Sequence, residues 1–374
     1  MRASTGQMRA ARRREEFYVA SQWRLMRQKF VRHKLAVVGA VVLGCFYLVA
    51  LFAEVVAPYD PIQRSSDHYY PPSRIHLFDQ NGRFHPLGYV YDIKKTFDVK
   101  TRRAQFVEDL DLGAPIRLFV RGDEYKLWGV FAGDLHLFGV AGEPRVYLFG
   151  TESLGRDLFS RIIIASRISL SIGLVGVLLS FLLGSLLGGL SGFYGGAVDN
   201  LIQRTIELLR SIPTIPLWMS LAAIIPRDWP ILRTYFMITV VLSFVGWTGL
   251  ARVVRGKLIS LREEDFVLAA KLAATPDWRI IVVHLIPSFF SYLIVDLTLA
   301  IPYMILGETA LSFLGLGIQP PAVSWGTLLI DAQRVTVVAH HPWLLIPGVF
   351  IVVAVLGFNF LGDGLRDAAD PYHV

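Results

Sequence analysis

Apolar blocks, each roughly 20 residues long, constrain the fold of this chain more than any other feature. A helix that crosses a bilayer needs about that many apolar residues in a row, whereas a soluble domain mixes apolar and polar residues. Hydrophobic residues make up 53% of the 374 positions, and the mean hydropathy is +0.49. The sequence therefore predicts an all-α polytopic membrane protein.

We expect six transmembrane helices. The third is composite, because the amphipathic stretch Val198–Arg210 leads into an apolar run that Pro213 and Pro216 should kink. In the second, glycines at positions 184, 188 and 192 permit close packing against another helix. The other five helices are expected at residues 35–57, 168–193, 231–250, 289–311 and 343–361.

The lysine and arginine residues near the apolar blocks predict which side of the membrane each loop lies on. Ten of them lie in residues 1–34, against two acidic residues, and Arg252, Arg255, Lys257 and Arg262 follow the fourth block. Because cytoplasmic flanks of transmembrane helices are rich in Lys and Arg, both termini are expected in the cytoplasm. A nucleic-acid-binding arm is the competing interpretation of residues 1–34. A basic segment directly before a span favours the membrane, so no nucleic-acid partner is expected.

A long polar segment, residues 58–166, separates the first two spans, and it carries 14 basic and 14 acidic residues. We expect residues 65–148 to form a small β-rich extracytoplasmic insertion, followed by a lead-in helix. The stretch PIRLFVRGDEYKLWGVF (115–131) predicts two strands around a turn at Gly122–Asp123, and RVYLFG (145–150) predicts another strand. An unstructured loop is the alternative, and the aromatic content argues against it.

The loop 263–288 is too polar to cross a membrane, although it lies between two predicted spans. Its first part is rich in alanine, the best helix former, and a helix with so little side-chain bulk can approach another protein closely. Asp265 suits the start of this helix and Pro276 its end, and DWRII begins a second helix. A docking helix and an ordinary amphipathic connector both fit. The residues singled out are Asp265, Phe266, Leu268, Ala269, Ala270, Ala273 and Ala274.

The stretch DFVLAAKLAATPDWRIIVVHLIPS resembles the EAA loop of ABC-importer permeases, in which a Glu-Ala-Ala triplet precedes a glycine and a later Leu-Pro. Leu268 stands where that family has Glu, and Ala274 where it has Gly. GTESLGRDLFSRI, ETALSFLGLGIQPPAVSWGTLL and FNFLGDGLRDAADP are similar to segments of the dipeptide/oligopeptide/nickel branch. The chain most resembles the C-type subunit of oligopeptide permeases, over residues 30–61 and 149–374.

The resemblance implies the type I importer permease fold, a bacterial inner-membrane location and a transporter subunit that is not an enzyme. It also implies a second permease subunit, two ABC ATPase subunits and an extracytoplasmic solute-binding protein as partners. With Leu268 in place of Glu, the contact with the ATPase should depend on shape and apolar contact rather than on a salt bridge. The implied domains are a cytoplasmic arm (1–34), the first helix (35–57), the insertion with its lead-in helix (58–166), the permease core (167–362) and a cytoplasmic tail (363–374).

No nucleotide site is expected in this chain, because the nearest approach to a phosphate-binding loop, Gly256–Lys257, has Ala251 and Leu258 where Gly and Ser/Thr are needed. ATP and Mg²⁺ should therefore bind the partner subunits. No catalytic, cofactor-binding or metal-ligating pattern is recognised, and a metal site at His340 and His341 is a weak alternative.

Two acidic residues in the fifth apolar block are candidates for the transport pathway or for packing. A charge inside a bilayer is costly, so Asp296 should face a partner or the pathway. Glu308 is expected near the outer surface, where water can solvate it. Near the second span, Asp157 and Arg161 could form an i,i+4 pair, and Ser153 could cap the helix.

Three classes of function remain open. The first is an ABC-importer permease for oligopeptides, or for another solute of the same branch such as a nickel chelate, an oligosaccharide or a peptide-like compound. The second is an ion-coupled secondary transporter that uses Asp296 or Glu308, although no inverted repeat is visible. The third is a membrane-anchored binding module that displays residues 65–148.

Overall fold

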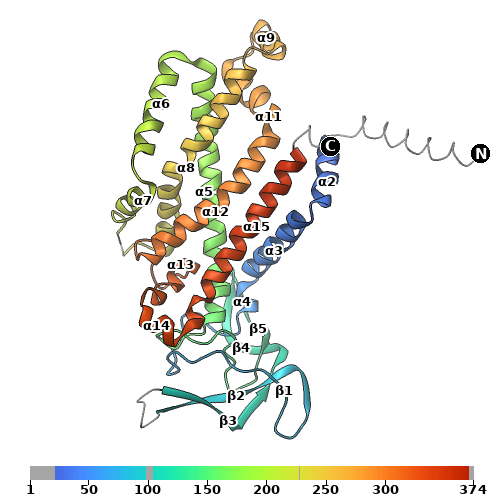
Figure 1. The fold of residues 1–374 in the computed structure, drawn as a ribbon, viewed down its shortest axis with the longest axis vertical. Coiled ribbons are helices and arrows are strands. Elements are labelled where there is room, and N and C mark those ends of the chain that lie inside the picture. Colours follow the sequence, from blue (N-terminus) through green and yellow to red (C-terminus); the bar gives the residue numbers. More distant parts are fainter. Residues whose placement is uncertain (1–21, 98–103, 227, 370–374) are drawn as a thin grey trace, which may run out of the picture.

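The structure is a computed structural model that describes residues 22–97, 104–226 and 228–369. A bundle of long helices carries a small β-rich part at one end, here called the strand end, and the short helix α9 (Asp265–Leu272) at the other, the α9 end (Figure 1). Most of the predicted basic arm, and the end of the predicted tail, lie outside the described residues.

Five helices in the described part of the chain are long and apolar enough to cross a membrane. Helix α6 (Gly196–Ser211) and helix α7 (Thr214–Ala222) cover the predicted third span, and neither is long enough alone. Ile212, directly before Pro213, has an extended backbone, as residues before proline prefer, so the expected kink is a complete break. The five are α3 (Lys34–Leu51), α5 (Leu158–Tyr194), α8 (Ile231–Leu261), α12 (Phe290–Phe313) and the helical stretch Pro342–Ala369, most of which is α15 (Ile346–Ala369).

Short helices join these long ones. Helix α2 (Gln22–Arg32) precedes α3 and packs beside the C-terminal part of α15, where His33 lies 3.6 Å from Asp367. The remaining short helices are α4 (Ala53–Val56), α10 (Asp277–Arg279), a π-helical turn (Ile280–Leu285), α11 (Ile286–Ser288), α13 (Trp325–Leu328), α14 (Val335–His340) and 3₁₀ turns at Asp331–Gln333 and Pro342–Leu345.

The β-rich insertion exists, but its strands differ from those predicted. Strands β1 (His76–Phe78), β2 (Phe84–Phe97) and β3 (Ala104–Pro115) form one antiparallel sheet, and β4 (Arg117–Leu127) pairs with β5 (Phe131–Gly139) in a second. The predicted turn at Gly122–Asp123 is wrong, since β4 continues through it with a register irregularity. The predicted strand at residues 145–150 is also wrong, because these residues lie outside any strand.

A close contact explains the irregularity in β4. A Cβ atom at Gly122 would lie 2.9 Å from the ring of His136 on β5, so only glycine permits this approach. The Asp123 carboxylate accepts a hydrogen bond from the backbone N–H of Asp60 at 3.0 Å. The Gly-Asp pair therefore forms a bulge that contacts the loop after α4 at Asp60, and the chain reverses later, at Trp128–Val130.

Helices α5 and α8 pack closely through the predicted small-residue face. A Cβ atom at Gly188 would overlap the carbonyl oxygen of Ala251, and one at Gly192 would lie 2.7 Å from that of Arg255. Lipid is as apolar as the side chains, so burial from water does not hold helices together in a bilayer. Close backbone contact of this kind stabilises the helix pair instead, through van der Waals packing. The partner of the glycine face, which the sequence did not identify, is thus α8.

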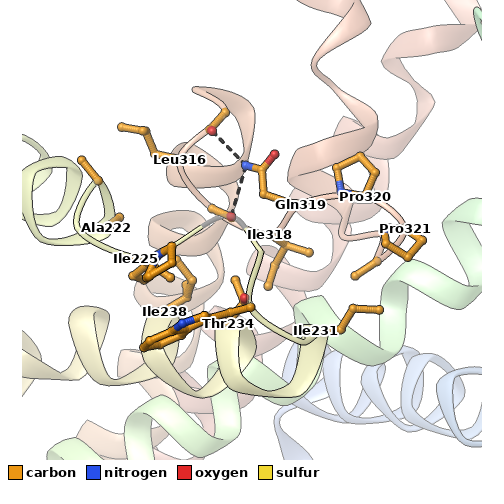
Figure 2. A pocket seen from close by; sticks show the side chains of 16 residues that line it. Ala222, Ile225, Ile231, Thr234, Ile238, Leu316, Ile318, Gln319, Pro320 and Pro321 are labelled. Carbon is orange, nitrogen blue, oxygen red and sulfur yellow. Dashed lines mark hydrogen bonds between the residues drawn. The ribbon is translucent and has the colours of Figure 1, made fainter.

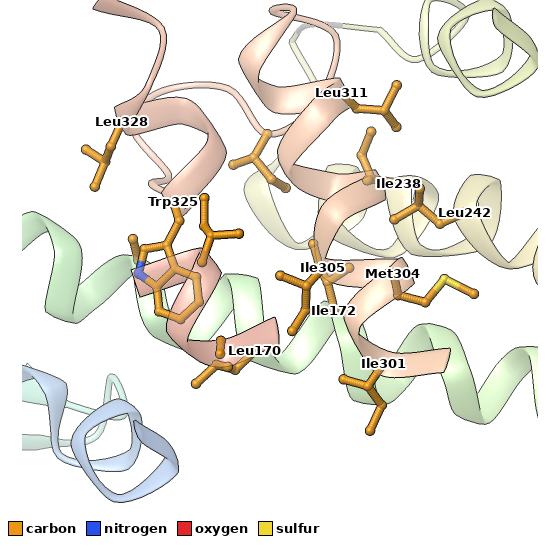
Figure 3. Packing of buried hydrophobic residues seen from close by; sticks show 14 of the residues in the cluster. Leu170, Ile172, Ile238, Leu242, Ile301, Met304, Ile305, Leu311, Trp325 and Leu328 are labelled. Atoms are coloured by element: carbon orange, nitrogen blue, oxygen red, sulfur yellow. The ribbon is translucent and has the colours of Figure 1, made fainter. Parts of the chain in front are cut away.

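The core toward the strand end is built around Trp325 of α13, which is fully buried (Figure 3). Its ring N–H donates to the carbonyl oxygen of Ile162 at 3.1 Å, and its backbone N–H donates to the Ser169 hydroxyl at 3.0 Å. The rings of Phe46 on α3 and Phe350 on α15 lie 6.0 and 6.2 Å from the Trp325 ring, and α13 also contacts α5 and α12. The loop after α12 therefore re-enters the bundle rather than lying on its surface. The hydrophobic cluster to which Trp325 belongs also includes Leu170, Ile172, Leu242, Ile305 and Leu328.

Candidate functional site

Helix α9 occupies the loop between two long helices, α8 and α12, at the end of the bundle farthest from the strands (Figure 1). Glu264 precedes the helix in an extended conformation, and Asp265 lies in its first turn, where a negative charge favours the helix dipole. The sequence predicted both this helix and the helical return that starts at Asp277.

Three residues attach α9 to the bundle. Val267 is fully buried, and Ala270 packs against the same cluster of apolar side chains. The Lys271 ammonium lies 5.2 Å from the centre of the Phe193 ring at the end of α5. Helix α9 therefore contacts both α5 and α8; the cluster includes Val254, Leu258, Ile281 and Leu285.

The opposite face of α9 is apolar and exposed. Ala269 and Ala273 are exposed, and Leu272 is 89% exposed, which is unusual for a leucine on an ordered helix. The sequence analysis did not single out Leu272. It could have been found as an apolar residue beside the alanines of the predicted docking helix. Phe266 and Leu268, both predicted, complete this exposed face.

Ala274 ends the helix in a left-handed conformation, with φ of 54°. Its N–H donates to the carbonyl of Lys271 at 2.9 Å, and the N–H of Thr275 donates to that of Ala270 at 3.0 Å. These two bonds form a Schellman motif, whose left-handed position favours glycine. The position at which the sequence resemblance implies glycine is thus one where the backbone itself favours glycine.

Asp296 lies on α12 and lines a cavity of about 530 Å³. The side chain is half-buried, and among the described residues it has no ion pair. Arg210, Thr214 and Tyr303 also line the cavity, so polar groups from α6, α7 and α12 converge there. Apolar and small residues of α5 and α8 form the remaining wall, including Val177, Ser180, Val245, Thr248 and Leu250.

Glu308 is fully buried, so the expectation that water solvates it is wrong. Its carboxylate accepts a hydrogen bond from Ser312 at 2.6 Å, and Ser169 lies 3.5 Å away. Ser312 in turn accepts from the backbone N–H of Ile318, and Ser169 accepts from that of Trp325. Glu308 therefore organises the loop that carries α13. Hydropathy could not show this, since it does not tell which face of a helix is covered.

The lead-in to α5 also differs from its prediction. Asp157, not Ser153, caps the helix, accepting from the backbone N–H of Ser160 at 2.7 Å. Arg161 does not pair with Asp157; it lies 3.3 Å from Glu152 and donates to the carbonyl of Pro61 at 2.7 Å. The two charges are thus used to fix the segment before α5, a structural role.

His340 and His341 are both engaged in packing contacts. The His341 ring stacks on Tyr69 with centroids 4.3 Å apart, and His340 contacts the carbonyl of Thr336 at 2.8 Å. Within residues 22–97, 104–226 and 228–369 no cluster of three or more His, Cys, Asp or Glu side chains could hold a metal ion.

A second hollow, of about 180 Å³, lies between the α7–α8 connection and the loop Gly315–Ala322 (Figure 2). Gln319 is held by hydrogen bonds from its amide to the carbonyls of Gly315 and Gly317, at 2.9 and 3.4 Å. Apolar residues such as Ile225, Ile238 and Pro320 line the rest. The sequence analysis did not predict this hollow.

Comparison with known proteins identifies the family. Residues 150–372 match the family described as binding-protein-dependent transport system inner membrane component, and residues 21–72 match the N-terminal transmembrane domain of oligopeptide transport permease C. The chain is 43% identical to the oligopeptide transport system permease protein OppC of Escherichia coli K12 over 226 residues, which cover 60% of this chain and 72% of that protein.

Other relatives agree. OppC of Haemophilus influenzae is 41% identical over 226 residues (60% of this chain, 70% of that protein), and the dipeptide transport system permease protein DppC of Bacillus subtilis is 41% identical over 224 residues (60% and 68%). A solved structure of the MetNI methionine ABC transporter aligns with a TM-score of 0.44 at 16% identity, covering 56% of this chain and 97% of that one. The resemblance noted in the sequence is confirmed by the sequence relatives: the chain belongs to the family of binding-protein-dependent transport system inner membrane components, and it is a multi-pass membrane permease subunit rather than an enzyme.

Proposed function

We propose that this chain is one of the two permease subunits of an ATP-driven importer of peptides and forms half of the translocation pathway. The relatives named oligopeptide and dipeptide permeases support the solute class. The main support for coupling to an ATPase is the exposed apolar face of α9, which a soluble partner would cover.

The proposed topology has six crossings, with α6 and α7 together making the third. The α9 end is cytoplasmic, which the basic residues Arg252, Arg255, Lys257 and Arg262 beside it support. The packing of α2 beside the end of α15 brings residues near both termini together, consistent with an even number of crossings. The β-rich insertion is then extracytoplasmic, and the domain limits are those given above: 1–34, 35–57, 58–166, 167–362 and 363–374.

The proposed partners are a second permease subunit, two ABC ATPase subunits that hold ATP and Mg²⁺, and an extracytoplasmic solute-binding protein. The ATPase would cover the face formed by Phe266, Leu268, Ala269, Leu272 and Ala273, while Val267 and Ala270 attach α9 to the bundle. Asp265 and Ala274 set the two ends of the helix.

Coupling follows from how α9 is held. Since Val267 packs on α8 residues and Lys271 lies over Phe193 of α5, a movement of the ATPase subunits would displace both long helices together. The ATPase drives transport only if it binds two arrangements of these helices with different affinity. The cavity lined by Asp296 lies between these same helices, and we assign it to the pathway, with Asp296 as the acid that faces the passing solute. Glu308 is assigned to packing.

A pair of substitutions tests the docking face. Leu272→Asp places a charge on the most exposed leucine of α9, and Val335→Asp makes the same change at an equally exposed residue of α14, at the strand end. Both should fold, because neither residue is buried. Co-purification of the ATPase subunits should fall at least several-fold with L272D and stay unchanged with V335D; equal recovery in both variants would refute the docking face.

A second measurement addresses the energy source. Uptake of a labelled oligopeptide into cells should stop when ATP is depleted and continue when a protonophore collapses the proton gradient while ATP is intact. Uptake that follows the proton gradient would instead assign the chain to secondary transport.

A further inference from the structure

We propose that the tip of the β4–β5 hairpin binds the lipid bilayer surface beside α3 and so anchors the β-rich insertion to the membrane. The tip consists of Trp128, Val130 and Phe131, together with Phe52 directly after α3. This role goes beyond transport, and it depends only on α3 being a transmembrane helix.

The tip lies at the level where α3 leaves the apolar part of the bilayer. Helix α3 has 18 residues and is therefore about 27 Å long, close to the thickness of the hydrocarbon layer. The Trp128 ring N–H donates to the carbonyl oxygen of Leu51, the last residue of α3, at 2.8 Å. Arg167 of α5 bonds the same carbonyl at 3.3 Å and forms an ion pair with Glu54 at 2.6 Å. Charged groups thus begin one turn beyond Leu51, as they do at a membrane interface.

The side chains of the tip are apolar and exposed. Trp128 is 48%, Val130 73% and Phe131 60% exposed, and Phe52 beside them is 41% exposed. Trp128 contacts the rings of Phe52 and Phe131 with centroids 6.3 and 6.2 Å apart, so the three rings form one surface, and exposed Val130 directly precedes Phe131 in the chain. Such a patch on a chain in water marks an interaction site.

Lipid is the occupant that the surroundings indicate. The patch continues directly into the exposed side of α3, where Val41, Leu48 and Leu51 are 59%, 59% and 46% exposed, and this helix is one of the membrane spans. Tryptophan favours the headgroup level of a bilayer, and its N–H is already satisfied by Leu51. Lys126, exposed on β4 just before the tip, can reach lipid phosphates.

Spin labels at single cysteines test the proposal in the full chain, purified with any subunits that accompany it, in vesicles of phosphatidylethanolamine and phosphatidylglycerol. Cys45, the only cysteine of the sequence, is first replaced by alanine. A label is then placed by V130C at the tip, by V107C on β3 as a matched exposed valine, and by Leu48→Cys on α3 as a lipid-facing reference. All three positions are more than half exposed, so folding does not depend on them.

Oxygen collects in lipid and a nickel chelate stays in water, so their collision rates with the label report its surroundings. We expect the oxygen-to-nickel ratio at position 130 to be several-fold higher than at position 107 and to approach that at position 48. A ratio at position 130 equal to that at 107 would place the tip in water and overturn the proposal. A label at 130 that both reagents fail to reach would show that protein covers the tip, and would overturn it equally.

Discussion

At the scale of single residues, the left-handed Ala274 is a position where the backbone conformation favours glycine over alanine. A left-handed alanine costs about 1–2 kcal/mol, whereas glycine adopts this conformation freely but loses roughly 0.5–1 kcal/mol more conformational entropy on folding. Ala274→Gly should therefore stabilise the end of α9 by roughly 0.5–1 kcal/mol, which slows local opening about two- to fivefold. Amide hydrogen exchange at Thr275 measures this.

The neighbouring alanine provides the control. Ala273 has φ of −78°, so Ala273→Gly relieves no strain and should speed the same exchange. If both substitutions accelerated exchange, the conformation of Ala274 would not be strained.

Because of Asp157, the cap of α5, the stability of the folded chain should fall as the pH rises from 4 to 7. Burial raises its pKa from 3.8 to about 6, because it disfavours the charged form. Between these values the folded chain keeps a proton that the unfolded chain releases, so the contribution of Asp157 is full below pH 3.8 and is lost as the pH rises through about 6. The shift corresponds to about 3 kcal/mol.

Asp157→Asn isolates this effect, since asparagine caps helices equally well and does not titrate. Between pH 4 and pH 7 the unfolding temperature of D157N should rise relative to that of the wild-type chain. Parallel pH profiles of the two proteins would show that Asp157 is ionised in the fold.

At the scale of helices and strands, the contact between α5 and α8 depends on the absence of side chains. Gly188→Ala would place a methyl group against the backbone of Ala251, which cannot move without separating the helices, and should cost about 1–3 kcal/mol. Gly256→Ala on α8 meets no atom within 4 Å and should be neutral or stabilising. Thermal unfolding of the two purified variants compares them; equal losses would exclude close packing as the reason for glycine.

Local patterns predicted several elements well. The alanines and Pro276 gave α9 nearly to its limits, and long apolar runs gave the five spanning helices, because both signals depend on neighbouring residues. The β2–β3 hairpin was missed, because its residues are partly exposed on both faces and show no clear alternation. The bulge at Gly122 was predicted as a turn, since a Gly-Asp pair has the same local signal in both.

In the candidate site, too, the sequence predicted features that depend on neighbouring residues and missed those that depend on distant ones. The sequence named the alanines of α9 and Asp296 as candidates, but it could not show that Leu272 is almost fully exposed or that serines enclose Glu308. Both facts depend on contacts between segments far apart in the chain, such as α5 with the loop before α13.

At the scale of the whole molecule, the two ends of the insertion lie side by side, and its β4–β5 hairpin also contacts α4 and the end of α3. The backbone N–H of Ser73 donates to the carbonyl of Tyr147 at 2.8 Å, so the chain leaves and returns at one point. Replacing residues 74–145 by a short glycine–serine linker should leave the helix bundle folded and still able to bind the ATPase subunits. Recovery of a monodisperse chain after heating, followed by co-purification, measures this.

Trp325→Ala is the contrasting variant, because it removes the fully buried ring at the centre of the core and should cost about 3–5 kcal/mol. If the linker variant lost as much stability as this one, the insertion would be part of the folding unit of the bundle.

The π-helical turn at Ile280–Leu285 is a place where the chain can lose one residue without rotating the helices on either side. The N–H of Ile286 bonds to the carbonyl of Ile281, five residues back, so this turn holds one residue more than an α-helical turn. Removing a residue from α12 itself would rotate everything beyond it by about 100° and turn Asp296 away from its cavity. Removing one residue here can convert the π turn into an α turn, so a deletion at this junction leaves α9 and Asp296 facing the same directions.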